Sequence, residues 1–511
     1  MTKISFPALN RRQFLVSAAA GALTAGSLDG SRAFAEETPK KGGTLRVAVP
    51  GASADSIDPH FNQGQVSEMI RFTNMFDGLT GYDSGSDVRP MLAESFSSNE
   101  TADTWTVKLR QGVKTHDGRD FGADDVIFSV RRILDPGKAS KGAKLIDVVD
   151  ADKLEKVDDH TVVFTLKHAY GPFQDLWSNR FLRMVPRDFD PAKPVGTGPF
   201  RLTSYTAGQQ AAFARFDDYW GEKAHVDELI VATLGDATAG MNALRSGQVD
   251  ITYAVPYAEA KLVEADPRLK LLRNPSTQYL PIYMRTDLEP FNDVRVRQAL
   301  KLVADRDQLV KVAMNGYGAI ANDMVGRYLP CGETPVPQRV RDIEKAKALL
   351  AEAGKSDLKL EITTASDVPG LAQTAQVFAQ QAKEAGIEMK LNILEASAYL
   401  ANYTNWPLGV DFFNDMYLPL VSRTLLPGGP FNVSRWNDPE FVELAAEAFK
   451  TTDEAARCDI IQKMRTIEYE RGGSIVWGWS DILNAHGAHV GGLVPHKVDS
   501  PLSHLNKVWL G

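Results

Sequence analysis

Several stretches in the first half of the chain alternate between apolar and polar side chains, the pattern of a strand with one buried face. In TWTVKLR (104–110), Trp, Val and Leu fall on one side, and polar or basic residues fall on the other. The stretch 153–168 predicts two strands around a turn at Asp158–Asp159. GGTLRVAV (42–49) predicts a first strand after a flexible entry. Residues from about 80 to 195 are therefore predicted to be rich in strands, with one helix among them.

The second half of the chain has the spacing of helices. Apolar residues return every three or four positions within 293–314. The stretch 342–354 begins with an aspartate, a frequent N-cap, and ends with a glycine, a frequent C-terminal stop. The stretch 438–449 also begins with an aspartate, and a proline follows at the first helical position. Short strands predicted over 358–364 and 387–394 lie between such helices, so the sequence predicts an α/β fold.

The first 35 residues have the pattern of an export signal. The adjacent Arg11 and Arg12 precede an uncharged run over 14–28, and Ala-Phe-Ala at 33–35 forms a small-x-small cleavage pattern. This order predicts a secretory signal peptide over residues 1–35, whose apolar run is too short to span a membrane. The two arginines favour twin-arginine export of a folded protein, and the general secretory route is the alternative. We therefore expect the mature chain in the periplasm.

Charge and length narrow the class of protein further. The 511 residues carry a formal charge of −8, and residues 1–35 contain four basic and one acidic residue, which leaves −11 on the remainder. A surface of this sign disfavours nucleic acid and anionic membranes as partners. After removal of the signal, the length exceeds the usual ~100–200 residues of one domain, so more than one core is expected.

Motifs for enzymatic chemistry are absent from the sequence. It has no GxSxG elbow, no HExxH helix and no GxxxxGK[ST] loop. The glycine-rich GTGPF (196–200) lacks the spacing of a dinucleotide loop, and THDGRD (115–120) has the composition of a turn. We expect turns at both positions, no catalytic residues and no cofactor.

Histidines and cysteines raise two separate questions. Four of the nine histidines lie near the C-terminus, and imidazoles in a cluster can hold a transition metal: His486, His489, His496 and His504. Their loose spacing favours ordinary surface and core histidines, so no metal site is predicted. Cys331 and Cys458 are either joined in a disulfide, which an extracytoplasmic compartment permits, or are two buried free thiols.

Aromatic and polar residues are interleaved in four loops, as in sites that bind small polar solutes. The stretches are DLWSNRF (175–181), STQYLPIYM (276–284), NWPLGVDFFNDMYLPL (405–420) and IVWGWSD (475–481). Aromatic walls exclude water, and a few charged groups fix the orientation of a ligand. These loops therefore contain the candidate ligand contacts.

An ordered set of motifs runs along the chain and carries a resemblance that spans about residues 40 to 480, nearly all of the mature chain. It consists of GGTLRVAV, DSIDPHF, MFDGLTGYD, VRPMLAESF, TWTVKLRQGVKTHDGRDFGADDVIFSVRRILDP, GTGPFRLTSY, DYWG, LRSGQVDI and FNDVRVRQALKLVADRDQLV. As a set, these motifs resemble the extracellular solute-binding proteins of family 5, which serve ABC importers of the dipeptide, oligopeptide and nickel type.

The resemblance implies a periplasmic-binding-protein type II fold, with two lobes that close on a ligand around a hinge cleft, and an extra strand-rich subdomain on the first lobe. Mapped onto this chain, it gives lobe I as 36–75 and 195–272, the extra subdomain as 76–194, lobe II as 273–480, and a return to lobe I over 481–511.

The resemblance also implies candidate ligand contacts. Peptide-binding relatives place an aspartate near DFFNDMYLPLVS that pairs with the α-amino group of the ligand. Asp415 is the best match and Asp411 the second, although Phe413–Asn414 stands where the family usually has a Trp-Gly-like stretch. Arg180 is the candidate for a ligand carboxylate, because a guanidinium binds it bidentately. Further candidates are Asn62, Trp177, Tyr279, Asn414 and Tyr417.

The function implied is capture of a peptide or peptide-like solute and its delivery to the membrane subunits of an ABC permease by a monomeric, non-enzymatic protein. An opine, an oligosaccharide or a nickel or metal chelate are alternative ligands, since one scaffold can serve many solutes. A periplasmic hydrolase is the alternative from another class.

Overall fold

The computed structural model describes residues 39–51, 55–366 and 369–511. The predicted signal peptide, over residues 1–35, lies outside this part of the chain. None of the helices in the described ranges has the length and apolar character needed to cross a membrane.

The largest sheet has eight strands in the order β12-β19-β11-β1-β10-β9-β8, with β14 paired to β19. Its strands are β1 (Thr44–Pro50), β8 (Phe200–Thr206), β9 (Gln210–Arg215), β10 (Glu228–Leu234), β11 (Ile251–Thr252), β12 (Leu269–Tyr279), β14 (Gly318–Ile320) and β19 (Gly478–Gly487). β1 pairs in parallel with β10 and β11, while β12 and β19 are antiparallel. Apolar side chains of α1 (Val66–Met75) and of the C-terminal segment cover this sheet.

A four-stranded antiparallel sheet in the order β4-β5-β7-β6 follows in the chain. It contains β4 (Ala93–Ser98), β5 (Thr104–Leu109), β6 (Val149–Asp158) and β7 (Thr161–Leu166), and it packs with α2 (Ala123–Ile133) and α3 (Phe173–Leu176). The alternation predicted for β5 is confirmed, since Trp105, Val107 and Leu109 are all buried. The predicted turn at Asp158–Asp159 joins β6 to β7.

The third large sheet has five strands in the order β16-β15-β17-β13-β18. They are β13 (Ile282–Met284), β15 (Lys359–Ala365), β16 (Glu388–Leu394), β17 (Leu408–Val410) and β18 (Ser474–Ile475). The helices of this half are α6 (Val294–Val303), α7 (Arg306–Ala313), α8 (Ile343–Glu352), α9 (Leu371–Glu384), α10 (Ala396–Ala401), α11 (Tyr417–Leu420), α12 (Pro439–Lys450) and α13 (Glu454–Arg471), with a π-helical turn η1 (Val421–Leu425) after α11.

The remaining elements are short. They are the hairpins β2 (Thr80–Tyr82)–β3 (Val88–Pro90) and β20 (Val490–Gly491)–β21 (Trp509–Leu510), the helices α4 (Ala237–Arg245) and α5 (Ala260–Ala265), and the 3₁₀ segment η2 (Pro501–Lys507).

Local sequence signals explain how several helices begin and end. The Asp342 carboxylate accepts a hydrogen bond from the Lys345 amide at 2.9 Å and caps α8, as predicted. Gly354 follows α8 with a φ of +68°, a conformation that only glycine adopts at little cost. Asp438 caps α12 in the same way, by accepting from the Phe441 amide at 3.1 Å.

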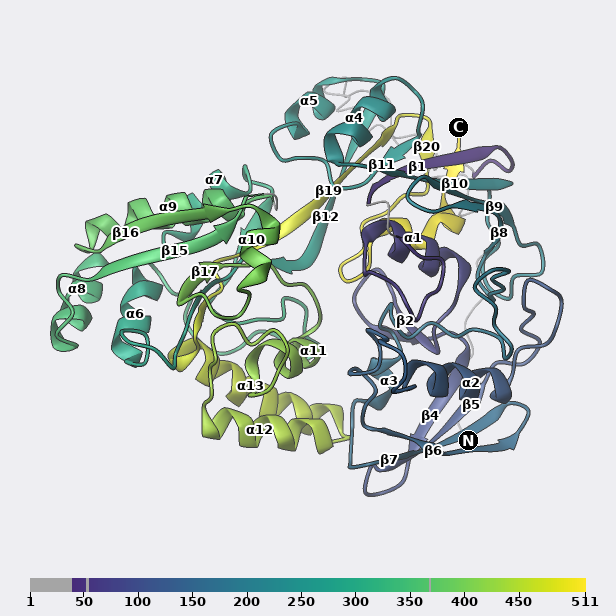
Figure 1. Cartoon of the computed structure of the whole chain (residues 1–511), viewed down its shortest axis with the longest axis horizontal. Helices are drawn as coiled ribbons and strands as arrows, with labels where there is room; N and C mark the ends of the chain where they lie inside the picture. The colour runs from purple at the N-terminus through teal and green to yellow at the C-terminus, as the bar shows by residue number, and fades with distance from the viewer. Residues whose placement is uncertain (1–38, 52–54, 367–368) are drawn as a thin grey trace, which may run out of the picture. The chain divides into compact units, whose positions relative to one another are not determined.

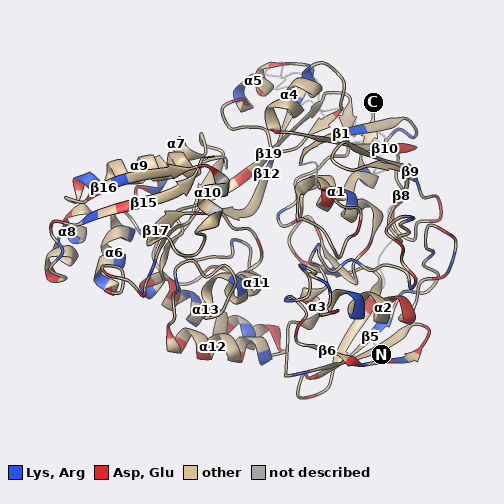
Figure 2. Ribbon diagram, viewed as in Figure 1, with Lys and Arg blue, Asp and Glu red and all other residues tan. Residues whose placement is uncertain are grey.

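For naming, lobe I denotes residues 39–272 and 481–511, and lobe II denotes residues 273–480. β12 and β19 pair along their length and pass from one to the other, as Figure 1 shows in teal and yellow. Each lobe has its own buried clusters, which gives the fold several separate cores. Figure 2 shows basic and acidic positions interspersed along α8, whereas α12 carries glutamates along its length and a lysine, Lys450, at its C-terminal end.

Candidate functional site

Two adjoining cavities are lined by residues of both lobes. Pocket A has a volume of about 900 Å³, and pocket B has a volume of about 1060 Å³. Both have a size that suits a small solute. They share the lining residues Tyr82, Tyr170, Asp175, Leu176 and Pro419. Because four of these five belong to lobe I, that lobe forms most of the junction between the pockets.

The lobes touch directly at the edge of pocket B. The Tyr170 ring stacks on the Phe449 ring, with centroids 5.6 Å apart, and the Gly171 amide donates a hydrogen bond to the Phe449 carbonyl at 2.6 Å. A Cβ atom at position 171 would lie 2.1 Å from the Thr451 carbonyl oxygen, so the close approach requires glycine. This contact brings the C-terminal end of α12 against lobe I.

A long loop over residues 320–338 forms most of the lobe II wall of pocket A, beside residues of α11 and α13. Cys331 in this loop is joined to Cys458 on α13 by a disulfide, which resolves the alternatives left open by the sequence. The Arg465 guanidinium on α13 donates to the Thr334 hydroxyl at 2.6 Å and to the carbonyls of Val325 and Gly326. The loop is therefore fastened to α13 at both ends and in the middle.

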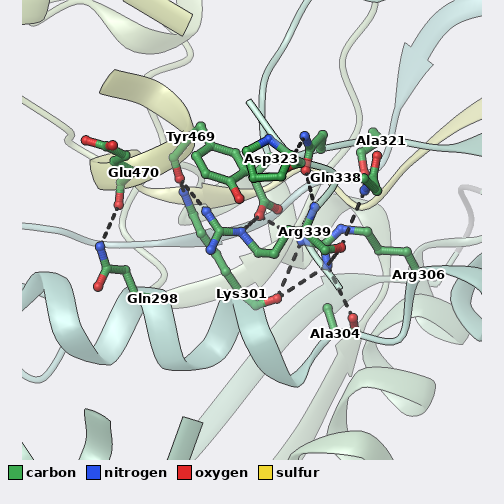
Figure 3. Close-up of polar contacts among 12 residues, drawn as sticks. Gln298, Lys301, Ala304, Arg306, Ala321, Asp323, Gln338, Arg339, Tyr469 and Glu470 are labelled. Carbon is green, nitrogen blue, oxygen red and sulfur yellow. Dashed lines mark hydrogen bonds and ion pairs between the residues drawn. The ribbon is translucent and has the colours of Figure 1, made fainter. Parts of the chain in front are cut away.

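A buried ionic network fixes the base of the same loop (Figure 3). The Asp323 carboxylate accepts from Arg306 at 2.7 Å and from Arg339 at 2.6 Å. Lys301 on α6 donates to the carbonyls of Glu468 and Tyr469 near the end of α13 at 3.1 and 3.0 Å. Burial lowers the pKa of Lys301 to about 7. The network lines neither pocket with its charges, so its role is to hold the wall.

Pocket B is lined by more basic than acidic side chains. The basic residues are Lys141, Lys144, Arg180, Arg423 and Lys450, and the acidic residues are Asp147, Asp175 and Asp415. This balance is opposite to that of the whole chain, whose formal charge is −8. A solute with at least one carboxylate suits such a lining.

Asp415, the leading candidate from the sequence, lines pocket B but already has a cationic partner. Its Oδ2 lies 3.2 Å from Nη1 of Arg423, and its Oδ1 accepts from the Met416 amide at 2.9 Å. Burial raises the pKa of Asp415, and Arg423 and Arg180 oppose that rise. Arg423 therefore already pairs with the carboxylate that the sequence predicted to bind the amino group of a ligand.

Arg180, the predicted partner of a ligand carboxylate, also lines pocket B. In the described ranges its exposed guanidinium has no hydrogen bond or ion pair; it lies 5.5 Å from the centroid of the Phe181 ring, and its charge acts at longer range on Asp415 and Tyr253. An arginine fork without a protein partner in a cavity is free to bind a carboxylate bidentately.

Asp175, inside the loop DLWSNRF, has the opposite charge and the same lack of a partner. It lines both pockets and is partly buried. Burial raises the pKa of its carboxyl group to about 6, although Arg457 opposes the rise. Neither this residue nor Arg423 stands out in the sequence, because burial and pairing are not visible in a linear pattern.

The structure brings together some of the other candidates and not the rest. Asn414 lines pocket B, and Tyr417 lines pocket A with its hydroxyl buried and without a partner among the described atoms. The remaining candidates line neither of the two pockets: Asn62, Trp177, Tyr279 and Asp411.

Packing accounts for their positions. Trp177 belongs to the core beneath the four-stranded sheet, and Asn62 donates to the Pro59 carbonyl within its own turn. Tyr279 is buried at the end of β12 and pairs through its backbone with Phe413. Asp411 is also buried, accepts from the Tyr403 hydroxyl at 2.6 Å, and has its pKa raised by burial to about 6.

The C-terminal histidines do not converge on one site. His489 pairs with Asp250 at 3.0 Å and lies near His486, outside the group formed by His496 and His504. Nitrogen and oxygen atoms of His496, Asp499 and His504 lie within 4.8 Å of one another, in a geometry open to a metal ion. However, Nδ1 of His496 accepts from the Asp499 amide at 3.1 Å, and its ring also bonds the Tyr82 backbone. With both nitrogens in use, His496 is a poor ligand, and the geometry does not favour a metal centre.

The two motifs predicted to be turns lie against each other. Ring nitrogens of His116 contact the Gly198 carbonyl at 3.0 Å and the Gly196 amide at 3.2 Å. Burial lowers the pKa of His116 to about 4, so the ring is neutral at physiological pH. Because His116 lines neither pocket, its contacts serve to connect the two turns.

Comparison with known proteins gives the family context. Residues 87–417 match the family described as bacterial extracellular solute-binding proteins, family 5 Middle. The glutathione-binding protein GsiB of Pectobacterium atrosepticum is 27% identical over 448 residues, which cover 80% of this chain and 84% of that protein.

Solved structures agree in fold. The binding protein AgaA in complex with agropinic acid, from A. tumefacien R10, is 26% identical, with a TM-score of 0.74 over 92% of this chain and 99% of that one. The ABC transporter substrate-binding protein CtaP from Listeria monocytogenes is 24% identical, with a TM-score of 0.82 over 92% and 100% of the two chains. The predicted fold class, a two-lobed periplasmic-binding-protein type, is confirmed by these neighbours.

Proposed function

The chain belongs to the bacterial extracellular solute-binding proteins of family 5, the binding components of ABC importers, and on that premise we propose that it holds a small peptide-like solute in pockets A and B. It works outside the cytoplasm and passes its ligand to membrane permease subunits. Because the members of this family are binding proteins, the alternative of a periplasmic hydrolase is set aside.

One observation carries the proposal. Both pockets are lined by both lobes, and pocket B holds a guanidinium, Arg180, that no described protein group satisfies. A ligand that contacts both walls stabilises the closed arrangement, because only that arrangement makes both sets of contacts. A carboxylate on the ligand supplies the missing partner of Arg180, and the Asp415–Arg423 pair beside it holds a second guanidinium in place.

The similarity to GsiB and AgaA supports this ligand class. The former is named for binding glutathione, and the latter was solved with agropinic acid. An opine-type acid is therefore the second candidate, favoured by the likeness to AgaA. An oligosaccharide gains no support from a lining rich in Lys and Arg, and the histidine geometry does not favour a metal.

Isothermal titration calorimetry tests the proposal with mixed dipeptides to tetrapeptides, glutathione and agropinic acid as probes. We expect saturable binding at one site per chain. Arg180→Gln should weaken the binding of a peptide with a free C-terminal carboxylate by about tenfold or more. The affinity for the same peptide with an amidated C-terminus should not change. The matched control is Arg201→Gln, an exposed arginine on β8 outside both pockets. Equal affinity of wild type and Arg180→Gln for every probe would remove Arg180 from the site.

A further inference from the structure

The carboxylate of Asp175 has no bonding partner in the described part of the chain. Its backbone amide donates to the Pro172 carbonyl at 3.1 Å, and its backbone carbonyl accepts from the Ser178 hydroxyl at 2.7 Å. These bonds stabilise the short helix α3 through the backbone of Asp175, and its carboxylate takes part in neither of them. The same side chain lines both pockets, so it lies where a ligand would cross from one to the other.

Its charged neighbours do not neutralise it. Arg457 on α13 acts on Asp175 only at a distance, because its Nη1 donates to the carbonyls of Thr451 and Thr452 at 2.8 and 3.2 Å. Glu454, one turn earlier on α13, repels it. The hydroxyl groups of Tyr82 and Tyr170 are the other titratable groups that interact with it.

Asp77, an almost fully buried carboxylate in lobe I, is a structural group and serves as a comparison with the partly buried Asp175. Asp77 accepts hydrogen bonds from the Thr197 hydroxyl at 3.0 Å, the Tyr219 hydroxyl at 3.2 Å and the Trp220 indole at 2.8 Å. These donors offset the cost of removing its charge from water. Asp175 is only partly buried and has no such set of donors, so within the described residues its carboxylate is left available to a cationic group of a ligand.

We propose that Asp175 binds the ammonium group of the ligand, and that the solute is a zwitterion whose amino group lies at the junction of the pockets and whose carboxylate points to Arg180 in pocket B. This inference rests on the proposed function and narrows its substrate class. It assigns the ammonium to a lobe I residue, in place of Asp415, whose charge Arg423 already meets. An N-blocked solute is then a poor ligand, because an acylated amine carries no charge to offer a buried carboxylate.

The test compares the tightest-binding peptide of the panel with its N-acetyl form, by calorimetry at pH 7.5. Three proteins are needed: the wild type, Asp175→Asn, and Asp217→Asn as a matched control. Asp217 lines neither pocket, and its side chain is 74% exposed and lies 2.8 Å from Arg215. Far-ultraviolet circular dichroism and thermal unfolding of each variant establish that it is folded.

We expect acetylation to weaken binding to the wild type and to Asp217→Asn by about tenfold or more. Asp175→Asn should bind the free peptide as weakly as the wild type binds the acetylated one, and should no longer distinguish the two. If Asp175→Asn keeps the full preference for the free amine, the assignment of Asp175 is wrong while the proposed function stands. If the wild type binds no peptide in either form, the proposed peptide class fails, and the inference fails with it.

Discussion

The two walls of the cleft differ in whether their charged side chains have partners within the described part of the protein. On the lobe II side of pocket A, the loop 320–338 is fastened by a disulfide, by Arg465 and by the Asp323 network, and these charges are matched within the protein. On the lobe I side, Asp175 and Arg180 lie five residues apart without partners among the described residues. Under the proposed function, lobe II would supply a firm surface and lobe I would recognise the charges of the ligand.

The largest expected effect comes from breaking the firm wall. Asp323→Asn leaves the buried guanidinium groups of Arg306 and Arg339 without their anion. Removing one member of a buried ionic group costs about 3–5 kcal/mol. Urea unfolding followed by circular dichroism should show a loss of this size, whereas Asp217→Asn, an exposed partner of Arg215, should change stability by less than about 1 kcal/mol. Equal losses in the two variants would show that the network does not hold the wall.

The disulfide should contribute the next largest effect. Cys331 and Cys458 are separated by 127 residues, and opening such a long loop enlarges the unfolded ensemble. The double variant Cys331→Ser/Cys458→Ser should lose about 2–4 kcal/mol in the same urea experiment. Adding a reductant should destabilise the wild type and not the double variant. Insensitivity of the wild type, with reduction verified by thiol titration, would contradict this part of the account.

Replacing a charged residue of the lobe I wall should increase the stability of the protein instead of lowering it. Because burial raises the pKa of Asp175 to about 6, its ionised form disfavours folding at neutral pH. Asp175→Asn should therefore be more stable than the wild type by about 1–2 kcal/mol at pH 7.5. The folded state binds more protons than the unfolded state between pH 4 and 6, so this advantage should vanish as the pH falls toward 4. A destabilised Asp175→Asn at pH 7.5 would indicate a structural role.

The pH dependence of affinity should give the smallest effect. Protonation of Asp175 below its pKa of about 6 removes the attraction for an ammonium group, although Arg457, Glu454, Tyr82 and Tyr170 remain around it. Affinity of the wild type for a free-amine peptide should fall about tenfold between pH 7.5 and pH 5. Asp175→Asn should be nearly flat over this range. A wild-type profile that matches the variant would contradict the role of the carboxylate.

The sequence was sufficient where the structure depends on local signals. The alternation in β5 and the aspartate caps of α8 and α12 need only neighbouring residues, and the resemblance to family 5 correctly indicated the fold class. The site depends on contacts that no local pattern contains. Asp175 interacts with Arg457 and Glu454, which lie on a helix about 280 residues later in the chain.

The ion pair between Asp415 and Arg423 could not be predicted from the sequence either. Arg423 reaches Asp415 because a proline-containing α11 and the π-turn η1 set the spacing between them, rather than a regular helix. Asp415 therefore looked like a free carboxylate in the sequence and is an ion-paired one in the structure. The aromatic candidates Trp177 and Tyr279 share the composition of the site loops, yet packing places them outside both pockets.

The most direct test of the central claim is a calorimetric titration of the tightest-binding free peptide into the wild type and into the double variant Asp175→Asn/Arg180→Gln. The account predicts one saturable site per wild-type chain and a loss of affinity of about a hundredfold or more in the double variant, since two charged contacts are removed. Binding of undiminished affinity by a folded double variant would show that lobe I does not read the charge of the ligand.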